Sequence, residues 1–218
     1  MIRTKIEKGL DELGFEIGSV SEAILSTVNQ DCSANASPMG ILRVGPKTLE
    51  IRPFNTSTTY RNLLARSRAC INVTSDPSMY LVTAFKRESL VGFPKPSFKG
   101  DLRLDPSDAY IFIDVIGRRD LSKTRTSYEC EATSVEVCRL TPRAFSRGRA
   151  EAIEAVVHAT RIEVFMRQGK RESVERLIKR FRASKDVVER VSAPESKEAR
   201  VVKELERLIS SWRDRESR

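Results

Sequence analysis

The feature that most constrains the fold is a change in the spacing of apolar residues near residue 142. Before that point, short runs rich in Val, Ile, Thr, Tyr and Phe alternate with turn-forming residues, which predicts β-strands. After it, apolar residues recur every three or four positions, which predicts amphipathic helices. The sequence therefore predicts a β-barrel domain over residues 1–141 and a helical region over residues 142–218.

Seven runs in the first part have strand character: Ala23–Asn29, Met39–Val44, Thr48–Phe54, Ala69–Thr74, Tyr80–Phe85, Tyr110–Ile116 and Tyr128–Leu140. One short helix is predicted over Thr59–Ser67. A slip in the alternation of the last run predicts a β-bulge near Thr133 and Ser134. Many short strands at this spacing favour a barrel over an alternating βαβ sheet. The fold class is therefore mainly β, and α+β once the helices are included.

Three helices are predicted in the second part from apolar residues at helical spacing: Ile153, Val156, Val157, Thr160 and Val164; Val174, Leu177, Ile178 and Phe181; Val201, Val202, Leu205, Leu208, Ile209 and Trp212. This part also carries most of the net charge of +9, because residues 141–218 hold 20 Lys and Arg against 13 Asp and Glu. Acidic residues are interleaved with the basic ones and aromatic residues are scarce. Nucleic-acid binding through this region is therefore the less favoured reading.

The composition also limits cofactors and location. The chain has 218 residues, and no run approaches the roughly 20 apolar residues of a spanning helix. Its N-terminus has no apolar signal-peptide core, so a cytoplasmic protein without membrane contact is expected. The four cysteines lack metal-site spacing and His158 is the only histidine, which predicts no metal site. Cys70 and Cys130 lie in apolar runs and are expected in the core.

Two polar stretches are the candidate binding elements. In residues 26–40, STVNQDCSANASPMG, a strand is expected to end, a turn to follow and a strand to resume at Met39. Small hydroxyl and amide side chains there suit a planar heteroaromatic ligand, although the stretch taken alone is more typical of an ordinary polar hairpin loop. In residues 52–63, RPFNTSTTYRNL, a hydroxyl cluster opens a short helix, with Ser57, Thr58 or Thr59 as its N-cap. A helix start with a nearby Arg can bind phosphate, or the hydroxyl can be a plain cap.

Together these stretches resemble an archaeal family of unknown function whose members adopt the FMN-binding split-barrel fold of flavin reductases and flavoredoxin. The resemblance continues into residues 72–77, NVTSDP, and into residues 144–149 and 153–161, and so covers roughly residues 20–165. It implies a homodimer of split barrels with a C-terminal helical region and with FMN bound near the subunit interface.

The resemblance also implies which residues contact FMN. Thr58, Thr59 and Asn62 match the positions that hold the FMN phosphate in the related reductases. Ser57 stands where those reductases often have Lys, so Arg52 or Arg61 is expected to supply the positive charge. The remaining implied contacts are with the ribityl chain or ring at Ser26 and Thr27, and with the isoalloxazine at Asn35, Ala36, Ser37 and Pro38.

One residue departs from the family pattern. Cys32 occupies a turn position where the family usually has Gly. Because Cys is poorly suited to a positive φ, a different turn type is expected here. Cys32 is for that reason not assigned to the site.

A polar set on helix 153–165 is the only candidate for catalysis. Glu154, His158 and Arg161 share one helical stripe. His158 can donate a proton and Arg161 can hold an anionic substrate, whereas the alternative is a salt-bridged helix flank. The function expected overall is an FMN-binding flavoprotein, a flavin-dependent oxidoreductase acting on a small molecule. The alternative is a protein that binds FMN without turnover.

Overall fold

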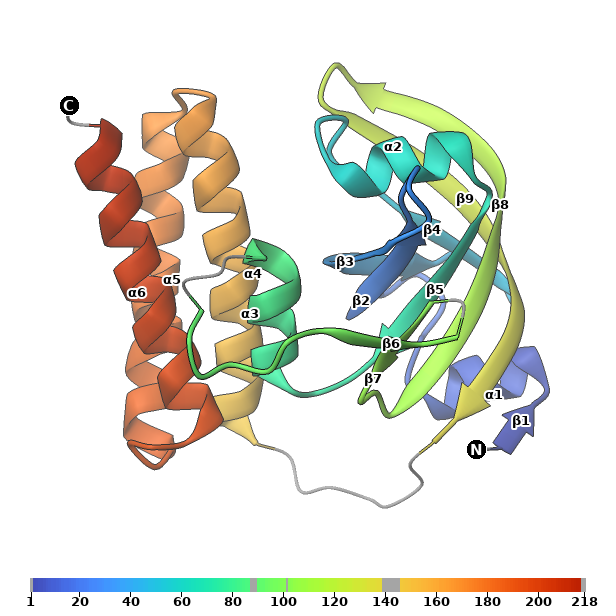
Figure 1. Ribbon diagram of the computed structural model, residues 1–218, viewed down its shortest axis with the longest axis horizontal. Helices are drawn as coiled ribbons and strands as arrows, with labels where there is room; N and C mark the ends of the chain where they lie inside the picture. The colour runs from blue at the N-terminus through green and yellow to red at the C-terminus, as the bar shows by residue number, and fades with distance from the viewer. Residues whose placement is uncertain (1, 87–89, 101, 139–145, 217–218) are drawn as a thin grey trace. The chain divides into compact units, whose positions relative to one another are not determined.

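The computed structural model describes residues 2–86, 90–100, 102–138 and 146–216 (Figure 1). It divides into two compact units. The barrel unit holds the chain up to Thr74 and from Pro96 to the end of the last strand, and the helical unit holds Ser75–Lys95 and the long helices near the C-terminus. Within the range 1–141 expected for the barrel domain, Ser75–Lys95 belongs to the helical unit. The boundary expected at residue 142 lies outside the described residues.

The barrel unit is one antiparallel sheet that closes on itself. Its order is β1-β9-β4-β3-β2-β5-β8, and β8 also pairs with β9, so six strands form a closed barrel with β1 added at one edge of β9. The strands are β1 (Ile2–Thr4), β2 (Val20–Val28), β3 (Ala34–Arg43), β4 (Thr48–Ile51), β5 (Arg68–Val73), β8 (Ala109–Ser122) and β9 (Arg125–Val137). The barrel and the helical region after it confirm the expected fold class.

Bulges let the long β8–β9 pair curve around the barrel. Phe112 pairs with Ser134 and the next residue, Ile113, pairs with Ala132, which leaves Thr133 as the extra residue. Two more register shifts follow toward the hairpin end. A bulge bends and twists its strand, so these positions close the sheet. The bulge predicted near Thr133 and Ser134 is confirmed.

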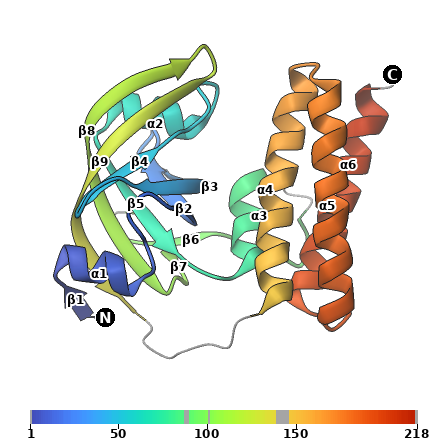
Figure 2. The ribbon, with the colours of Figure 1, turned by 180° about the vertical axis from the view of Figure 1, so that it is seen from behind.

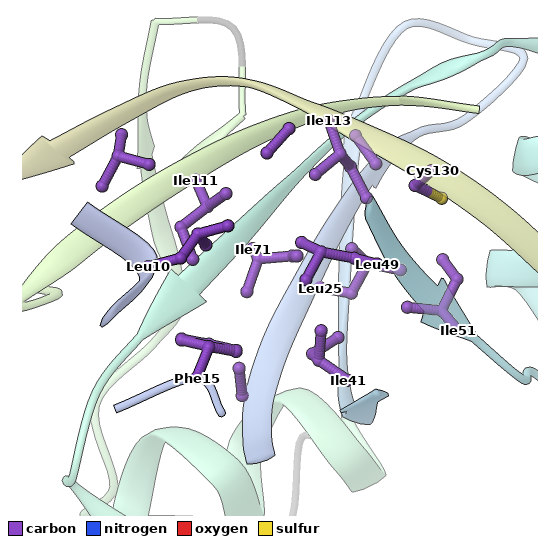
Figure 3. Close-up of a cluster of buried hydrophobic side chains, with 14 of the residues drawn as sticks. Leu10, Phe15, Leu25, Ile41, Leu49, Ile51, Ile71, Ile111, Ile113 and Cys130 are labelled. Atoms are coloured by element: carbon purple, nitrogen blue, oxygen red, sulfur yellow. The ribbon is translucent and has the colours of Figure 1, made fainter. Parts of the chain in front are cut away.

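The barrel interior is filled by alternate residues of each strand (Figure 3). Its cluster includes Leu25, Ile41, Ile71, Ile111 and Cys130, all fully buried. Burial raises the pKa of the Cys130 thiol to about 12, so the thiol stays protonated at neutral pH. Cys130 is therefore a small core residue, as expected.

A second apolar cluster lies on the other face of β2, β5 and β8. Cys70, Leu102 and Tyr110 form it, and Val28 and Phe112 pack against it. Leu102 comes from the turn between two short strands, β6 (Ser97–Lys99) and β7 (Arg103–Asp105), which pair as a separate hairpin. Cys70 is fully buried, and burial raises the pKa of its thiol to about 12. Its predicted place in the core is confirmed.

The hairpin is fastened to the barrel through Asn72, which is fully buried on β5. The amide nitrogen of Asn72 donates to the Ile24 carbonyl at 2.9 Å and to the Ser26 hydroxyl at 2.7 Å. Its amide oxygen accepts from the Leu104 backbone N–H at 2.8 Å. One side chain thus satisfies buried polar groups on β2 and β7, which would otherwise cost free energy.

The expected strand over Tyr80–Phe85 is wrong, because that segment is helical. Helix α3 spans Pro77–Phe85, and its N-cap Asp76 accepts a hydrogen bond from the Ser78 backbone N–H at 3.0 Å. Pro at the first helical position also favours a helix start. Nearly every residue of α3 is buried, so the segment is apolar on all sides. A short continuous apolar run does not distinguish a buried strand from a buried helix.

The three predicted long helices are present as α4 (Arg147–Arg167), α5 (Arg171–Val191) and α6 (Lys197–Glu216), side by side in Figure 2. Helix α4 contacts α3, α5 and α6, and it is buried over much of its surface. The aromatic rings of Phe85 on α3 and Trp212 on α6 lie 5.6 Å apart. The helical unit therefore has a core of its own.

The N-terminal segment contains elements that the sequence did not predict: β1 and helix α1 (Ile6–Glu12). Strand β1 pairs with β9, and α1 is held by Arg43, which is 2% exposed on β3. Its guanidinium donates to the Asp11 carboxylate and to the Phe15 and Pro46 carbonyls. A fully paired buried Arg of this kind has a structural role.

We expect Asn72→Ala to lower the free energy of unfolding by roughly 2–4 kcal/mol, since the Leu104 N–H loses its acceptor and the Ile24 carbonyl and Ser26 hydroxyl lose a donor in a buried site. Ser26→Ala removes a single partner and should cost about 1 kcal/mol. Urea unfolding of both variants measures the difference. Equal losses for the two would contradict the role assigned to Asn72.

Candidate functional site

The first polar stretch forms a tight hairpin, with a shorter turn than the sequence predicts. Strand β3 begins at Ala34, five residues before the expected Met39, and Thr27 pairs with Asn35 across the hairpin. Only residues 29–33 connect the strands. The polar residues expected in a loop are therefore strand residues, and the register fixes the face on which each lies.

Alternation along β2 and β3 sorts these residues into two sets. Thr27, Asn35 and Ser37 lie on one face, because cross-strand partners share a face and successive residues alternate. Ala36 and Pro38 occupy the intervening positions of β3 and so lie on the opposite face. Of the two, Ala36 is buried and Pro38 is half-buried.

Helix α2 (Thr58–Ala65) completes the first set, which we call the Thr27 cluster: Thr27, Asn35, Ser37, Thr59 and Asn62. The amide nitrogens of Asn35 and Asn62 donate to the Thr27 hydroxyl at 3.0 and 2.9 Å. The hydroxyls of Ser37 and Thr59 lie 2.8 Å apart. Five of the predicted site residues therefore meet in one hydrogen-bonded group.

Burial divides the roles within this cluster. The Thr27 side chain is 1% exposed and its hydroxyl receives two amide donors, so it positions Asn35 and Asn62. Ser37 is only half-buried and lies at the edge of the cluster. Asn62 also donates to the Asn29 amide oxygen at 2.9 Å, which ties the hairpin turn to the helix. Asn29 was not among the predicted site residues, although it lies within the first polar stretch.

The N-terminus of α2 adjoins the cluster. Ser57 is its N-cap, because its hydroxyl accepts from the Tyr60 backbone N–H at 3.1 Å. The N–H groups of Thr58 and Thr59 belong to the first turn and have no intrahelical acceptor. The Arg61 guanidinium reaches the Thr58 hydroxyl at 3.2 Å. This helix start therefore combines N–H groups, hydroxyls and a positive charge, a combination that binds phosphates.

Besides Ala36 and Pro38, two further predicted residues lie outside the Thr27 cluster. Ser26 is on the opposite face of β2 from Thr27, and its hydroxyl accepts from Asn72. The Arg52 guanidinium pairs with the Glu50 carboxylate at 2.5 Å. Of the two arginines considered for a phosphate, Arg61 is therefore the one placed at α2.

The turn at Cys32 is not of a different type after all. Its φ is +65°, the left-handed region that usually requires Gly, so the expectation of a different turn was wrong. The Asp31 carboxylate accepts hydrogen bonds from the backbone N–H and hydroxyl of Ser33, and these bonds lower the pKa of Asp31. Such a local bond stabilises the tight turn.

His158 and Arg161 lie on α4, in the helical unit. His158 is 4% exposed, and its Nε2 lies 3.4 Å from the Glu154 carboxylate. Within the part of the chain that is described, its Nδ1 has no hydrogen-bond partner. Burial lowers the pKa of His158, and the charges of Arg161 and Arg180 lower it further, while Glu154 opposes them. A neutral, buried imidazole is what this environment favours.

The closed antiparallel barrel with an added helical unit defines the class of the fold as a split barrel. The chain belongs to the family described as protein of unknown function DUF447: the family model of the N-terminal domain matches residues 21–139, and that of the second part matches residues 146–202. No helix among the described residues is long and apolar enough to cross a membrane.

Several solved structures are similar to this chain, and the first of them shares its fold. The FMN-bound protein MM1853 from Methanosarcina mazei is 23% identical, with a TM-score of 0.69 over 93% of this chain and 99% of that chain. The styrene monooxygenase flavin reductase from Pseudomonas putida S12 is 14% identical, with a TM-score of 0.44 over 54% of this chain and 81% of that chain. The 2-nitrobenzoate 2-nitroreductase NbaA from Pseudomonas fluorescens is 18% identical, with a TM-score of 0.43 over 62% and 73%.

The lowered pKa of His158 predicts a pH-dependent stability. Unfolded His binds a proton near pH 6.5 and folded His158 only at lower pH, so protonation favours unfolding and stability falls as pH drops below about 6.5. His158→Gln should lack this component, which cannot exceed about 1.4 kcal/mol per pH unit for one group. Urea unfolding of both proteins between pH 7.5 and 5 measures it. A constant difference between them would refute the prediction.

Proposed function

We propose that this protein binds FMN and acts as a flavin-dependent oxidoreductase on a small molecule. The observation that carries the proposal is the placement of the Thr27 cluster beside the N-terminus of α2, where Arg61 adds a positive charge. The FMN-bound relative of the same fold supports it.

The hydrogen-bond donors of this site suit the phosphate of FMN, and its small residues suit the ring. Thr58, Thr59 and Arg61 would hold the phosphate through hydroxyls, first-turn N–H groups and the guanidinium. The half-buried Ser37 would border the ring, and Asn35 and Asn62 would be kept in place by Thr27. Pro38 lies on the opposite face of β3 and is left out of this proposal. Small residues let a flat ring approach the backbone of β3.

In such a protein the flavin supplies the hydride or electron chemistry, and the chain supplies binding and orientation. The Thr27 cluster contains amides and hydroxyls, which orient hydrogen bonds without titrating near neutral pH. The buried His158 belongs to the core of the helical unit, so we assign it no proton-transfer step. A protein that binds FMN without turnover stays the alternative, and reduction of the bound flavin by NADH or NADPH separates the two.

Asn62→Leu and Thr58→Val should each weaken FMN binding about tenfold, since each removes hydrogen-bonding capacity worth roughly 1–1.5 kcal/mol. Arg61→Gln should weaken FMN binding more than riboflavin binding, because only FMN carries the phosphate. Quenching of flavin fluorescence measures each affinity.

Thr48→Val, which removes a hydroxyl on β4, is the matched control and should bind FMN normally. Ser26→Ala should lower stability and leave FMN affinity unchanged, since its hydroxyl faces Asn72. Loss of affinity in Ser26→Ala with normal affinity in Asn62→Leu would place the flavin on the other face of β2 and contradict the proposal.

We further propose a homodimer with FMN near the subunit interface. Two exposed apolar side chains support this: Leu64 on α2 and Leu121 on β8, 46% and 41% exposed. The β8–β9 hairpin holds the segment before α2, because Asn55 N–H donates to the Thr124 carbonyl at 3.0 Å. Leu64 therefore lies on the helix of the proposed flavin site, and Leu121 lies on the hairpin that holds the segment before this helix.

Light scattering should give about twice the chain mass of 24.6 kDa. Leu121→Lys should shift the protein toward the monomer, because a charge in an apolar interface is costly. Ile17→Lys, at a similarly exposed site on the segment before β2, serves as the control. A monomeric wild type would contradict the dimer.

A further inference from the structure

A cleft in the barrel unit lies apart from the Thr27 cluster. It has a volume of about 680 Å³, within the range of small-molecule sites. Its walls come from the end of β2, the β2–β3 turn, the C-terminal end of α2, the start of β5, the β6–β7 turn and β8. Val28, which lines it, lies on the opposite face of β2 from Thr27.

The floor of the cleft is apolar and fixed. Val28 and Phe112 pack against the buried cluster that contains Leu102, and all three residues line the cleft. The Arg103 guanidinium lies 4.8 Å from the centre of the Phe112 ring and makes two hydrogen bonds, of 3.0 and 3.1 Å, to the buried Glu136 carboxylate. The aromatic ring is therefore held in position before any ligand arrives.

The rim is positively charged. Arg66 and Arg68 line it on either side of Ser67. The Arg66 guanidinium donates to the Cys32 sulfur at 3.5 Å and has no carboxylate partner among the described residues. Arg68 lies 3.6 Å from Asp114, in an exposed pair that contributes little. The Asp31 carboxylate in the nearby turn is bonded to Ser33.

We propose that this cleft is a second binding site, which takes a small organic anion with a flat apolar body, of the aromatic carboxylate class. The apolar body lies on Phe112, Leu102 and Val28, and the anionic group binds Arg66 and Arg68. An uncompensated guanidinium above an aromatic floor favours this chemistry over a neutral or cationic ligand. The site neither requires FMN nor shares its residues with the Thr27 cluster.

Cys32 makes the proposal measurable, because its thiol lies on the rim. The full chain is treated with iodoacetamide, a neutral reagent, with and without 2-naphthoate, and peptide mass spectrometry follows each thiol. Cys138 is also exposed but does not line the cleft, so it is an internal control. At a probe concentration of about four times its Kd, alkylation of Cys32 should slow about fivefold while that of Cys138 is unchanged.

Three comparisons test the chemistry. Neutral naphthalene-2-methanol should protect Cys32 from alkylation far less than 2-naphthoate does. Arg66→Gln should weaken protection by 2-naphthoate about tenfold, as expected for a lost charge-assisted hydrogen bond. Arg118→Gln removes an exposed Arg on β8 outside the cleft and should have no effect. Each rate is compared with the same variant without probe, so changes in thiol reactivity cancel.

Equal protection by the neutral alcohol, equal protection of Cys138, or full protection in Arg66→Gln would each overturn the proposal. A further arm uses FMN. Protection of Cys32 by 2-naphthoate should persist at saturating FMN. If FMN itself protects Cys32 and displaces 2-naphthoate, the cleft is a flavin site and the proposal is wrong.

Discussion

The structure depends on closure of the barrel by β9, which pairs with β1 and β4 along one edge and with β8 along the other. Closure leaves no free edge on β8 or β4 and places β2 and β3 in the interior of the sheet. The bulges in the β8–β9 pair provide the curvature. The same hairpin holds the segment before α2, so the helix that carries Thr58 and Asn62 is positioned by the element that closes the sheet.

Successive side chains of β2 point to opposite faces of the sheet, and the two faces have different surroundings. Thr27 faces α2 and gathers amides and hydroxyls, whereas Ser26 and Val28 face Asn72 and the β6–β7 hairpin. The β2–β3 turn joins the two sides, because Asn29 contacts Asn62 on α2 and Cys32 contacts Arg66, the residue directly after α2. The proposed flavin site and the cleft therefore both adjoin the β2–β3 turn and α2.

The regular spacing of apolar residues made most of the fold predictable from the sequence. The three long helices and the bulge at Thr133 follow from spacing, and the hydroxyl cluster before α2 marks the start of that helix. Spacing failed where tertiary burial decides, as in α3, whose apolar run suits a strand equally well. The conformational preference of Cys was also misleading at Cys32, because the hairpin turn there has a positive φ although Cys disfavours it. The separation of Ser26 from Thr27 needed the β2–β3 register, which polar composition does not reveal.

The insertion of α3 between β5 and β6 affects the order in which the protein can fold during synthesis. This nearly fully buried apolar helix packs on α4 and α6, which are translated last. At ordinary rates of elongation, α3 waits on the order of ten seconds for α6 to be made. The β-strands are complete before α4 begins. The barrel can therefore close first, while the apolar residues of α3 are still without their packing partners. Exposed apolar residues of this kind are what chaperones bind on a nascent chain.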